Sequence, residues 1–84
     1  MGNAISLAEM PTGEKGKIAV IQGGHGLVRK LDAMGIRIGK EITKVSEQWM
    51  RGPVLLRQGN TQVAIGFGMA QQILVELCPE GGNT

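Results

Sequence analysis

Few side chains in this 84-residue sequence could carry out chemistry. It contains a single histidine, His25, and a single cysteine, Cys78. A stable transition-metal site uses three or four ligands, so these two side chains would need acidic residues or a second chain to complete it. Nucleophilic catalysis needs a nucleophile, a base and an orienting acid in one cleft, and nothing in the sequence supports such a set. We therefore expect no enzyme, no catalytic residue and no cofactor, and keep His25 and Cys78 only as candidates for a weakly bound divalent transition metal ion.

The glycine-rich segment at residues 24–29 begins like a dinucleotide-binding fingerprint. Its sixth position is Arg29, where the fingerprint requires glycine. Too little chain surrounds it for a βαβ unit with the acidic residue that binds ribose. The segment therefore predicts a turn that leads into a helix.

A second group of residues points to binding and not to catalysis. The only tryptophan, Trp49, stands beside Met50 and Arg51 at what should be a strand end or a hairpin tip. These three residue types are enriched among the side chains that anchor protein interfaces. The alternative is that Trp49 folds over the end of the domain as a lid.

The charges are unevenly distributed along the chain, although the net charge is only +2. All nine basic residues lie between Lys15 and Arg57, and the only acidic residues in that stretch are Asp32, Glu41 and Glu47. Such a division could present a basic face to an acidic partner. A solvated surface on which the charges segregate by chance explains the same pattern.

The elements that must position these residues begin with a short helix over residues 27–34. The apolar positions that recur on a 3.6-residue period are Leu27, Val28, Leu31 and Met34. Arg29 and Lys30 fall outside this stripe, which makes the helix one-sided and basic. Gly35 stands where a left-handed residue ends a helix, and Ile36 is placed to pack back over the last turn.

Short apolar stretches separated by turn residues predict about five strands. We place them at residues 17–22, 40–49, 54–56, 63–65 and 73–78. The run at residues 18–21 indicates either burial on both faces or too short a pattern to decide. Ile42 and Val45 have opposite parity, which predicts a bulge or a sharp bend if both side chains point inward. Gly59 and Asn60 predict a hairpin turn.

Two short turns complete the expected elements. Residues 6–9 fit a capping box that supports one helical turn, and residues 66–70 predict a turn with one short helical turn. Five strands and so little helix in under 80 residues favour a mainly β fold, a small curled antiparallel barrel. Closing such a sheet would remove strand edges that a chain of this size could not otherwise cover.

Length and composition predict one domain at residues 5–78, with a flexible N-terminus at residues 1–4 and a disordered tail at residues 79–84. The longest purely apolar run is far shorter than the roughly 20 residues of a membrane-spanning helix, so we expect no insertion into a membrane. With one cysteine the chain cannot form an internal disulfide, which favours a reducing, cytoplasmic setting.

The segment at residues 30–39 resembles the Arg-Leu-x-x-Met/Leu-Gly-x-x-x-Gly signature of the ferrous iron transport protein A (FeoA) family, with Lys30 in the arginine position. Further matches follow in the order of the family, namely Leu7 with Gly13, the glycines of residues 23–26, residues 52–54, residues 63–65, and Ala70 with Ile73 and Val75. The resemblance spans about residues 5–77.

This resemblance implies an SH3-like barrel in the cytoplasm of a bacterium or archaeon. Such proteins assist the large membrane ferrous iron transporter, which carries a cytosolic GTP-binding domain, as regulatory or interaction modules. Family members are often said to bind transition metals, yet the shared motif consists of glycines and aliphatic residues. We read its Leu31, Met34, Gly35 and Gly39 as structural: the two side chains fill the barrel mouth and the two glycines permit turns.

From the resemblance we expect a partner surface for the cytosolic domain of that transporter. The residues assigned to it are Trp49, Met50, Arg51, Arg29, Lys30 and Arg37. Two alternatives stay open: a small basic barrel that binds RNA, for which two aromatic residues are a poor stacking set, and a direct Fe(II) carrier. We expect no nucleic-acid partner, and the aliphatic edge strands leave a homo-oligomer open.

Overall fold

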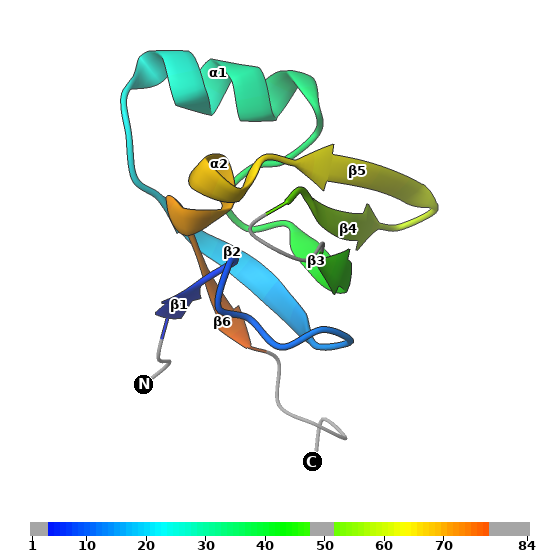
Figure 1. Cartoon of the computed structure of the whole chain (residues 1–84). Helices are drawn as coiled ribbons and strands as arrows, with labels where there is room; N and C mark the ends of the chain where they lie inside the picture. Colours follow the sequence, from blue (N-terminus) through cyan, green and yellow to red (C-terminus); the bar gives the residue numbers. More distant parts are fainter. Residues whose placement is uncertain (1–3, 48–51, 78–84) are drawn as a thin grey trace.

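The computed structural model describes residues 4–47 and 52–77 of the chain. Along the sequence its elements are β1 (Ala4–Ser6), β2 (Lys15–Ile21), α1 (His25–Ala33), β3 (Glu41–Glu47), β4 (Val54–Gln58), β5 (Thr61–Ile65), α2 (Phe67–Gln71) and β6 (Ile73–Leu77) (Figure 1). The predicted strands, the hairpin, the main helix and the helical turn before the last strand are all present. The predicted positions Trp49, Met50, Arg51 and Cys78 and the tail at residues 79–84 lie outside the described residues.

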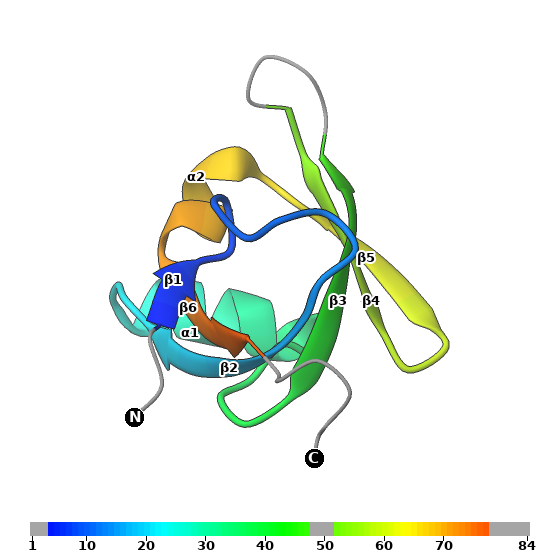
Figure 2. The same ribbon diagram turned by 90° about the horizontal axis from the view of Figure 1, so that it is seen from below.

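The strands form one antiparallel sheet in the order β1-β6-β2-β3-β4-β5. The sheet curls around a common interior, with α1 at one end (Figures 1 and 2). This confirms the predicted mainly β, SH3-like barrel. The sequence predicted a sheet that closes on itself, but among the described strands β1 and β5 are the two edges and do not pair with each other; α2 leads from β5 into β6.

Strand β1 was not expected from the sequence. It pairs with β6 through Ala4↔Glu76, Ile5↔Val75 and Ser6↔Leu74. A strand of three residues is too short to show an alternating pattern, so only the presence of β6 beside it fixes its conformation. Ala4, which had been assigned to a flexible N-terminus, therefore belongs to the sheet.

Helix α1 ends as its local sequence predicts. Gly35 has φ +85°, in the left-handed region. Its N–H donates to the carbonyl of Asp32, and the N–H of Ile36 donates to the carbonyl of Leu31, both at 2.9 Å. These are the two hydrogen bonds of a Schellman motif, and Ile36 and Leu31 are both buried.

Both long strands contain a bulge. The pairing of β2 with β6 shifts between Ile18 and Val20, and that of β3 with β4 shifts between Lys44 and Ser46. The second shift confirms the irregularity predicted from the parity of Ile42 and Val45. Strand β2 is not buried on both faces, because Ile18 is buried while Val20 is 42% exposed.

The core is aliphatic and continuous through the barrel. Its buried apolar side chains come from every strand except β1, from both helices, from the turn after β1 and from the segment after α1: Leu7, Met10, Ile18, Leu31, Ile36, Ile42, Val54, Leu56, Ile65, Ala70, Ile73 and Val75. Met34 packs against this cluster from the end of α1. Burial of these side chains is the main source of stability in so small a domain.

One charged side chain, Lys44 of β3, also points into the interior and is 0% exposed. Its Nζ donates hydrogen bonds to the carbonyl oxygens of Leu7 and Ala8, each at 3.1 Å, and of Met10 at 2.7 Å. These carbonyls belong to the turn after β1, in which Ser6 Oγ accepts a hydrogen bond from the N–H of Glu9 at 3.2 Å, as the capping box predicted. Lys44 therefore fastens this turn to the barrel wall.

The Lys44→Met variant should lower the free energy of unfolding by about 2 kcal/mol, because the carbonyl oxygens of the turn lose the hydrogen bonds from Nζ while the aliphatic stem is kept. Lys40→Met, at an exposed lysine next to the same strand, should change it by no more than about 0.5 kcal/mol. Urea denaturation followed by circular dichroism measures both. A Lys44→Met protein as stable as the parent would show that these hydrogen bonds give no net stabilisation.

The Gly35→Ala variant should lose about 1–2 kcal/mol of stability. A side chain is strained at φ +85°, and its Cβ would stand 3.0 Å from Gln58 Nε2. Gly26→Ala, inside α1, meets no atom within 4 Å and should gain up to about 1 kcal/mol. Thermal unfolding of the two variants should therefore move in opposite directions, and a Gly35→Ala protein as stable as the parent would contradict this account of the turn.

Candidate functional site

An apolar hollow on the described surface lies beside α1. It has a volume of about 330 Å³ and is lined by Ile21, Val28, Asp32, Ile36, Arg37 and Ile38. We call it the α1 groove. Its walls come from α1, from the segment that follows α1, and from the end of β2.

The chain builds this groove through the turn at the end of α1. Val28 and Asp32 are one helical turn apart, so they share a flank of the helix next to the buried Leu31. After Gly35, Ile36 enters the core and the chain returns along the helix, which places Arg37 and Ile38 at the groove. Gly39, with φ +94°, then directs the chain toward β3.

The lining of the groove combines four aliphatic side chains with two charged ones. Val28 is 39% exposed and Ile38 is 63% exposed, although both are aliphatic. Arg37 Nε forms an ion pair with Asp32 Oδ1, and both side chains are largely exposed. A solvated pair of this kind contributes under about 1 kcal/mol to stability. Exposed aliphatic side chains next to charged ones are typical of a protein docking surface.

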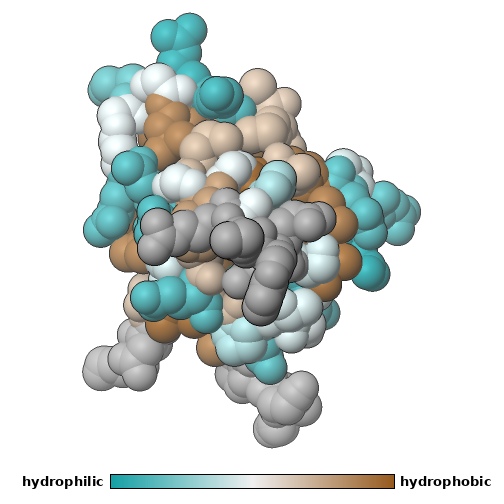
Figure 3. All heavy atoms as spheres, viewed as in Figure 1, coloured by the Kyte–Doolittle hydropathy of each residue, from teal (hydrophilic) through white to brown (hydrophobic). Residues whose placement is uncertain are grey.

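The basic residues assigned to a partner surface do not all lie on the same side of α1. Arg37 lines the groove. Arg29 follows Val28 and lies on the groove side of α1, whereas Lys30 is rotated by about 160° from Val28 and lies on the opposite flank. Hydrophilic side chains project from the α1 end of the molecule, with hydrophobic atoms visible between them (Figure 3). Arg29 and Arg37 therefore belong near one surface that excludes Lys30.

Sequence reasoning missed the exposed aliphatic residues of the groove. Val28 had been grouped with the core stripe of α1, but the structure buries Leu31 and leaves Val28 at the edge of that stripe, where no described element covers it. Ile38 had no role beyond its place in the motif. Ile38 lies between Arg37 and Gly39 in a short connection that has no strand or helix pattern. An aliphatic residue in such a place could have been predicted to be exposed.

The candidate metal ligands do not form a site within the described residues. His25 is exposed at the first residue of α1, and Cys78 lies outside the described residues. Within residues 4–47 and 52–77, no three His, Cys, Asp or Glu side chains gather as metal ligands would. The described side chains therefore do not fit a resident transition metal ion.

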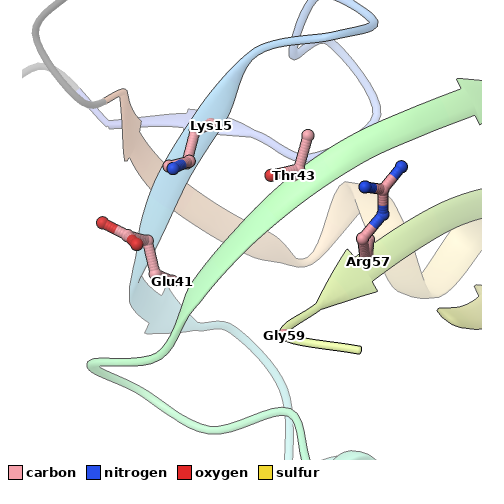
Figure 4. A pocket seen from close by; sticks show the side chains of 5 residues that line it. All are labelled: Lys15, Glu41, Thr43, Arg57 and Gly59. Atoms are coloured by element: carbon pink, nitrogen blue, oxygen red, sulfur yellow. The ribbon is translucent and has the colours of Figure 1, made fainter. Parts of the chain in front are cut away.

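A second hollow, of about 290 Å³, lies on the outer face of the sheet and is polar. It is lined by Lys15, Glu41, Thr43, Arg57 and Gly59. Two cations beside a hydroxyl group could attract an anion, but Figure 4 shows the Arg57 guanidinium pointing away from Lys15, while the Glu41 carboxylate occupies the same face. This hollow therefore has no convergent set of donors.

No helix in the described part of the chain is both long and apolar enough to cross a membrane.

The FeoA domain family matches residues 5–77. The protein named Fe(2+) transport protein A from Methanocaldococcus jannaschii is 36% identical over 77 residues, which are 92% of this chain and 92% of the relative.

Solved structures show the same fold. An FeoA-like protein from Clostridium acetobutylicum is 31% identical, with a TM-score of 0.83 over 95% of this chain and 93% of that chain. A manganese-dependent transcriptional repressor is 20% identical, with a TM-score of 0.84 over 92% of this chain but 43% of the repressor, and so shares the fold alone. The family match covers nearly all of this chain, and the relatives from Methanocaldococcus jannaschii and Clostridium acetobutylicum agree with it along nearly their full length. This chain belongs to the FeoA domain family.

Proposed function

We propose that this chain is a non-catalytic accessory protein of ferrous iron uptake, acting on the cytosolic side. Membership of the FeoA domain family supports a role in ferrous iron transport. In this proposal the chain docks on the cytosolic domain of the membrane ferrous iron transporter through the α1 groove. The observation that carries this proposal is that two aliphatic residues of the groove, Val28 and Ile38, are exposed to solvent.

A partner that covered the groove would gain binding free energy from burying its exposed aliphatic surface. Fully burying an aliphatic side chain of this size contributes about 1.5–3 kcal/mol, so covering the exposed part of Ile38 is worth about 1–2 kcal/mol and that of Val28 about 0.6–1.2 kcal/mol. Binding energy in interfaces concentrates in a few side chains that the partner desolvates fully, and exposed aliphatic residues of a groove can fill that role. The Arg37–Asp32 pair would then set orientation more than affinity.

The proposed mechanism is a shift of conformational populations. The C-terminal part of α1 is held to the core by the buried Leu31, and the chain just after the helix is held there by the buried Ile36. A bound partner changes the equilibrium between transporter conformations only by as much as its affinities for them differ. Fe(II) is then the cargo of the transporter, while this chain contributes binding energy. Trp49, Met50 and Arg51 remain assigned to the same contact by their sequence.

Replacing Ile38 by Ser should weaken binding to the isolated cytosolic domain of the transporter by at least about tenfold, because an apolar contact of the groove is lost. The matched control is Val20→Ser, which changes an aliphatic residue of β2 that is 42% exposed but does not line the groove. Isothermal titration calorimetry with the full-length chain should give a control affinity within about twofold of the parent. Equal effects of the two variants would remove the α1 groove as the docking site.

The two neighbouring cations of α1 should behave differently in the same titration. Arg29→Ala should weaken binding about threefold, because Arg29 lies on the groove side of the helix, while Lys30→Ala on the opposite flank should have less effect. The loss at Arg29 should shrink as salt is raised, since exposed charges are screened. A larger effect at Lys30 would indicate that the transporter contacts the other flank of α1.

A further inference from the structure

Strand β5 forms one edge of the sheet. Its only hydrogen-bonded neighbour among the described strands is β4, which it pairs from Val54↔Ile65 to Gln58↔Thr61. The other edge, β1, has three residues, whereas β5 has five. Of the two edges, β5 therefore offers the longer row of backbone groups to another strand.

The hairpin turn determines which backbone groups of β5 point outward. Gly59 and Asn60 form a two-residue loop, so Gln58 and Thr61 are the hydrogen-bonded pair that closes it. Hydrogen-bonded and non-hydrogen-bonded pairs alternate along an antiparallel ladder. The N–H and C=O groups of Gln62 and Ala64 must therefore point away from β4, and both residues are exposed.

This edge lacks the features that usually prevent strands from pairing. Residues 61–65 include no charged residue and no proline, and the five pairs with β4 run without a register shift. Natural edge strands are commonly protected by lysine, proline or a bulge. Both β2 and β3, which are interior strands, carry the bulges instead.

We propose that β5 pairs in antiparallel fashion with β5 of a second copy of this chain, about a two-fold axis at Val63. In this register Gln62 of each copy faces Ala64 of the other, and each such pair exchanges two backbone hydrogen bonds. The two Val63 side chains meet in the central non-hydrogen-bonded pair, where side chains lie closest. The strand is therefore complementary to itself.

The charges near β5 are compatible with this occupant. β5 brings no charge to the two-fold axis, and the nearest cation on its outer face is Arg57, opposite Gln62 on β4. In the joined sheet the two Arg57 side chains would be separated by three strand spacings, about 14 Å. That exceeds the Debye length of about 8 Å at physiological ionic strength, so they would repel little. No residue of the α1 groove takes part, and the pairing does not depend on the proposed function.

The pairing should be weak. An edge of five residues covers far less than the roughly 1,200 Å² of a stable interface. We therefore expect association at hundreds of micromolar, with the chain monomeric at low micromolar concentration.

The test is a dilution series of the full-length chain by NMR, from about 20 µM to about 1 mM. The diffusion coefficient should fall as concentration rises, and the amide resonances of Gln62 and Ala64 should shift most. Gln62→Pro removes an outward N–H, a change that an edge strand tolerates, and should weaken association at least about tenfold. The matched control Gln62→Ala keeps the N–H and should stay within about twofold of the parent.

Constant diffusion and constant Gln62 and Ala64 amides up to the highest concentration would overturn the proposal. So would association whose shifts map to β1 or to the α1 groove, or an equal loss in the two variants. If Gln62→Pro does not fold, the shifts of the parent chain decide between these outcomes by themselves.

Discussion

The buried ammonium of Lys44 is the constraint around which this small barrel is organised. A charge in an apolar interior is costly unless hydrogen bonds replace its water, and here carbonyl oxygens from the turn after β1 provide them. The backbone of the same residue is also fastened, since its N–H donates to the Glu14 carbonyl at 3.0 Å and its carbonyl accepts from the Gly13 N–H at 2.7 Å. One residue of β3 thus holds both the turn over the barrel and the start of β2.

The two helical features differ in what they leave exposed. The turn fastened by Lys44 sends Leu7 and Met10 fully into the core. Helix α1 buries Leu31 completely but leaves Val28 on its flank, and the Schellman turn brings Ile38 beside it. The α1 groove therefore results from the tight turn at the end of α1, because after this turn the chain runs back along the helix before it enters β3.

These features separate two surfaces on one small domain. The α1 groove combines aliphatic side chains with an ion pair, which suits a folded partner and fits the proposed contact with the ferrous iron transporter. The edge of β5 offers backbone groups with uncharged side chains, which suits another strand. Because the two share no residue, the proposed docking and the proposed self-pairing would not compete for the same atoms. Both proposals involve binding alone and assign no catalytic residue.

Local rules determined much of the backbone from the sequence alone. The end of α1 at Gly35, the hairpin at Gly59 and the bulge near Val45 each follow from residues only a few positions apart, because turns and caps are made by neighbours in the chain. The family signature around Leu31 and Met34 was likewise legible without coordinates. What the tertiary structure alone decided was the direction and covering of side chains: that Lys44 points inward, that Val28 and Ile38 remain exposed, and that β1 joins β6. Each of these depends on whether a segment distant in sequence supplies a carbonyl, a covering surface or a strand, and no local pattern records that.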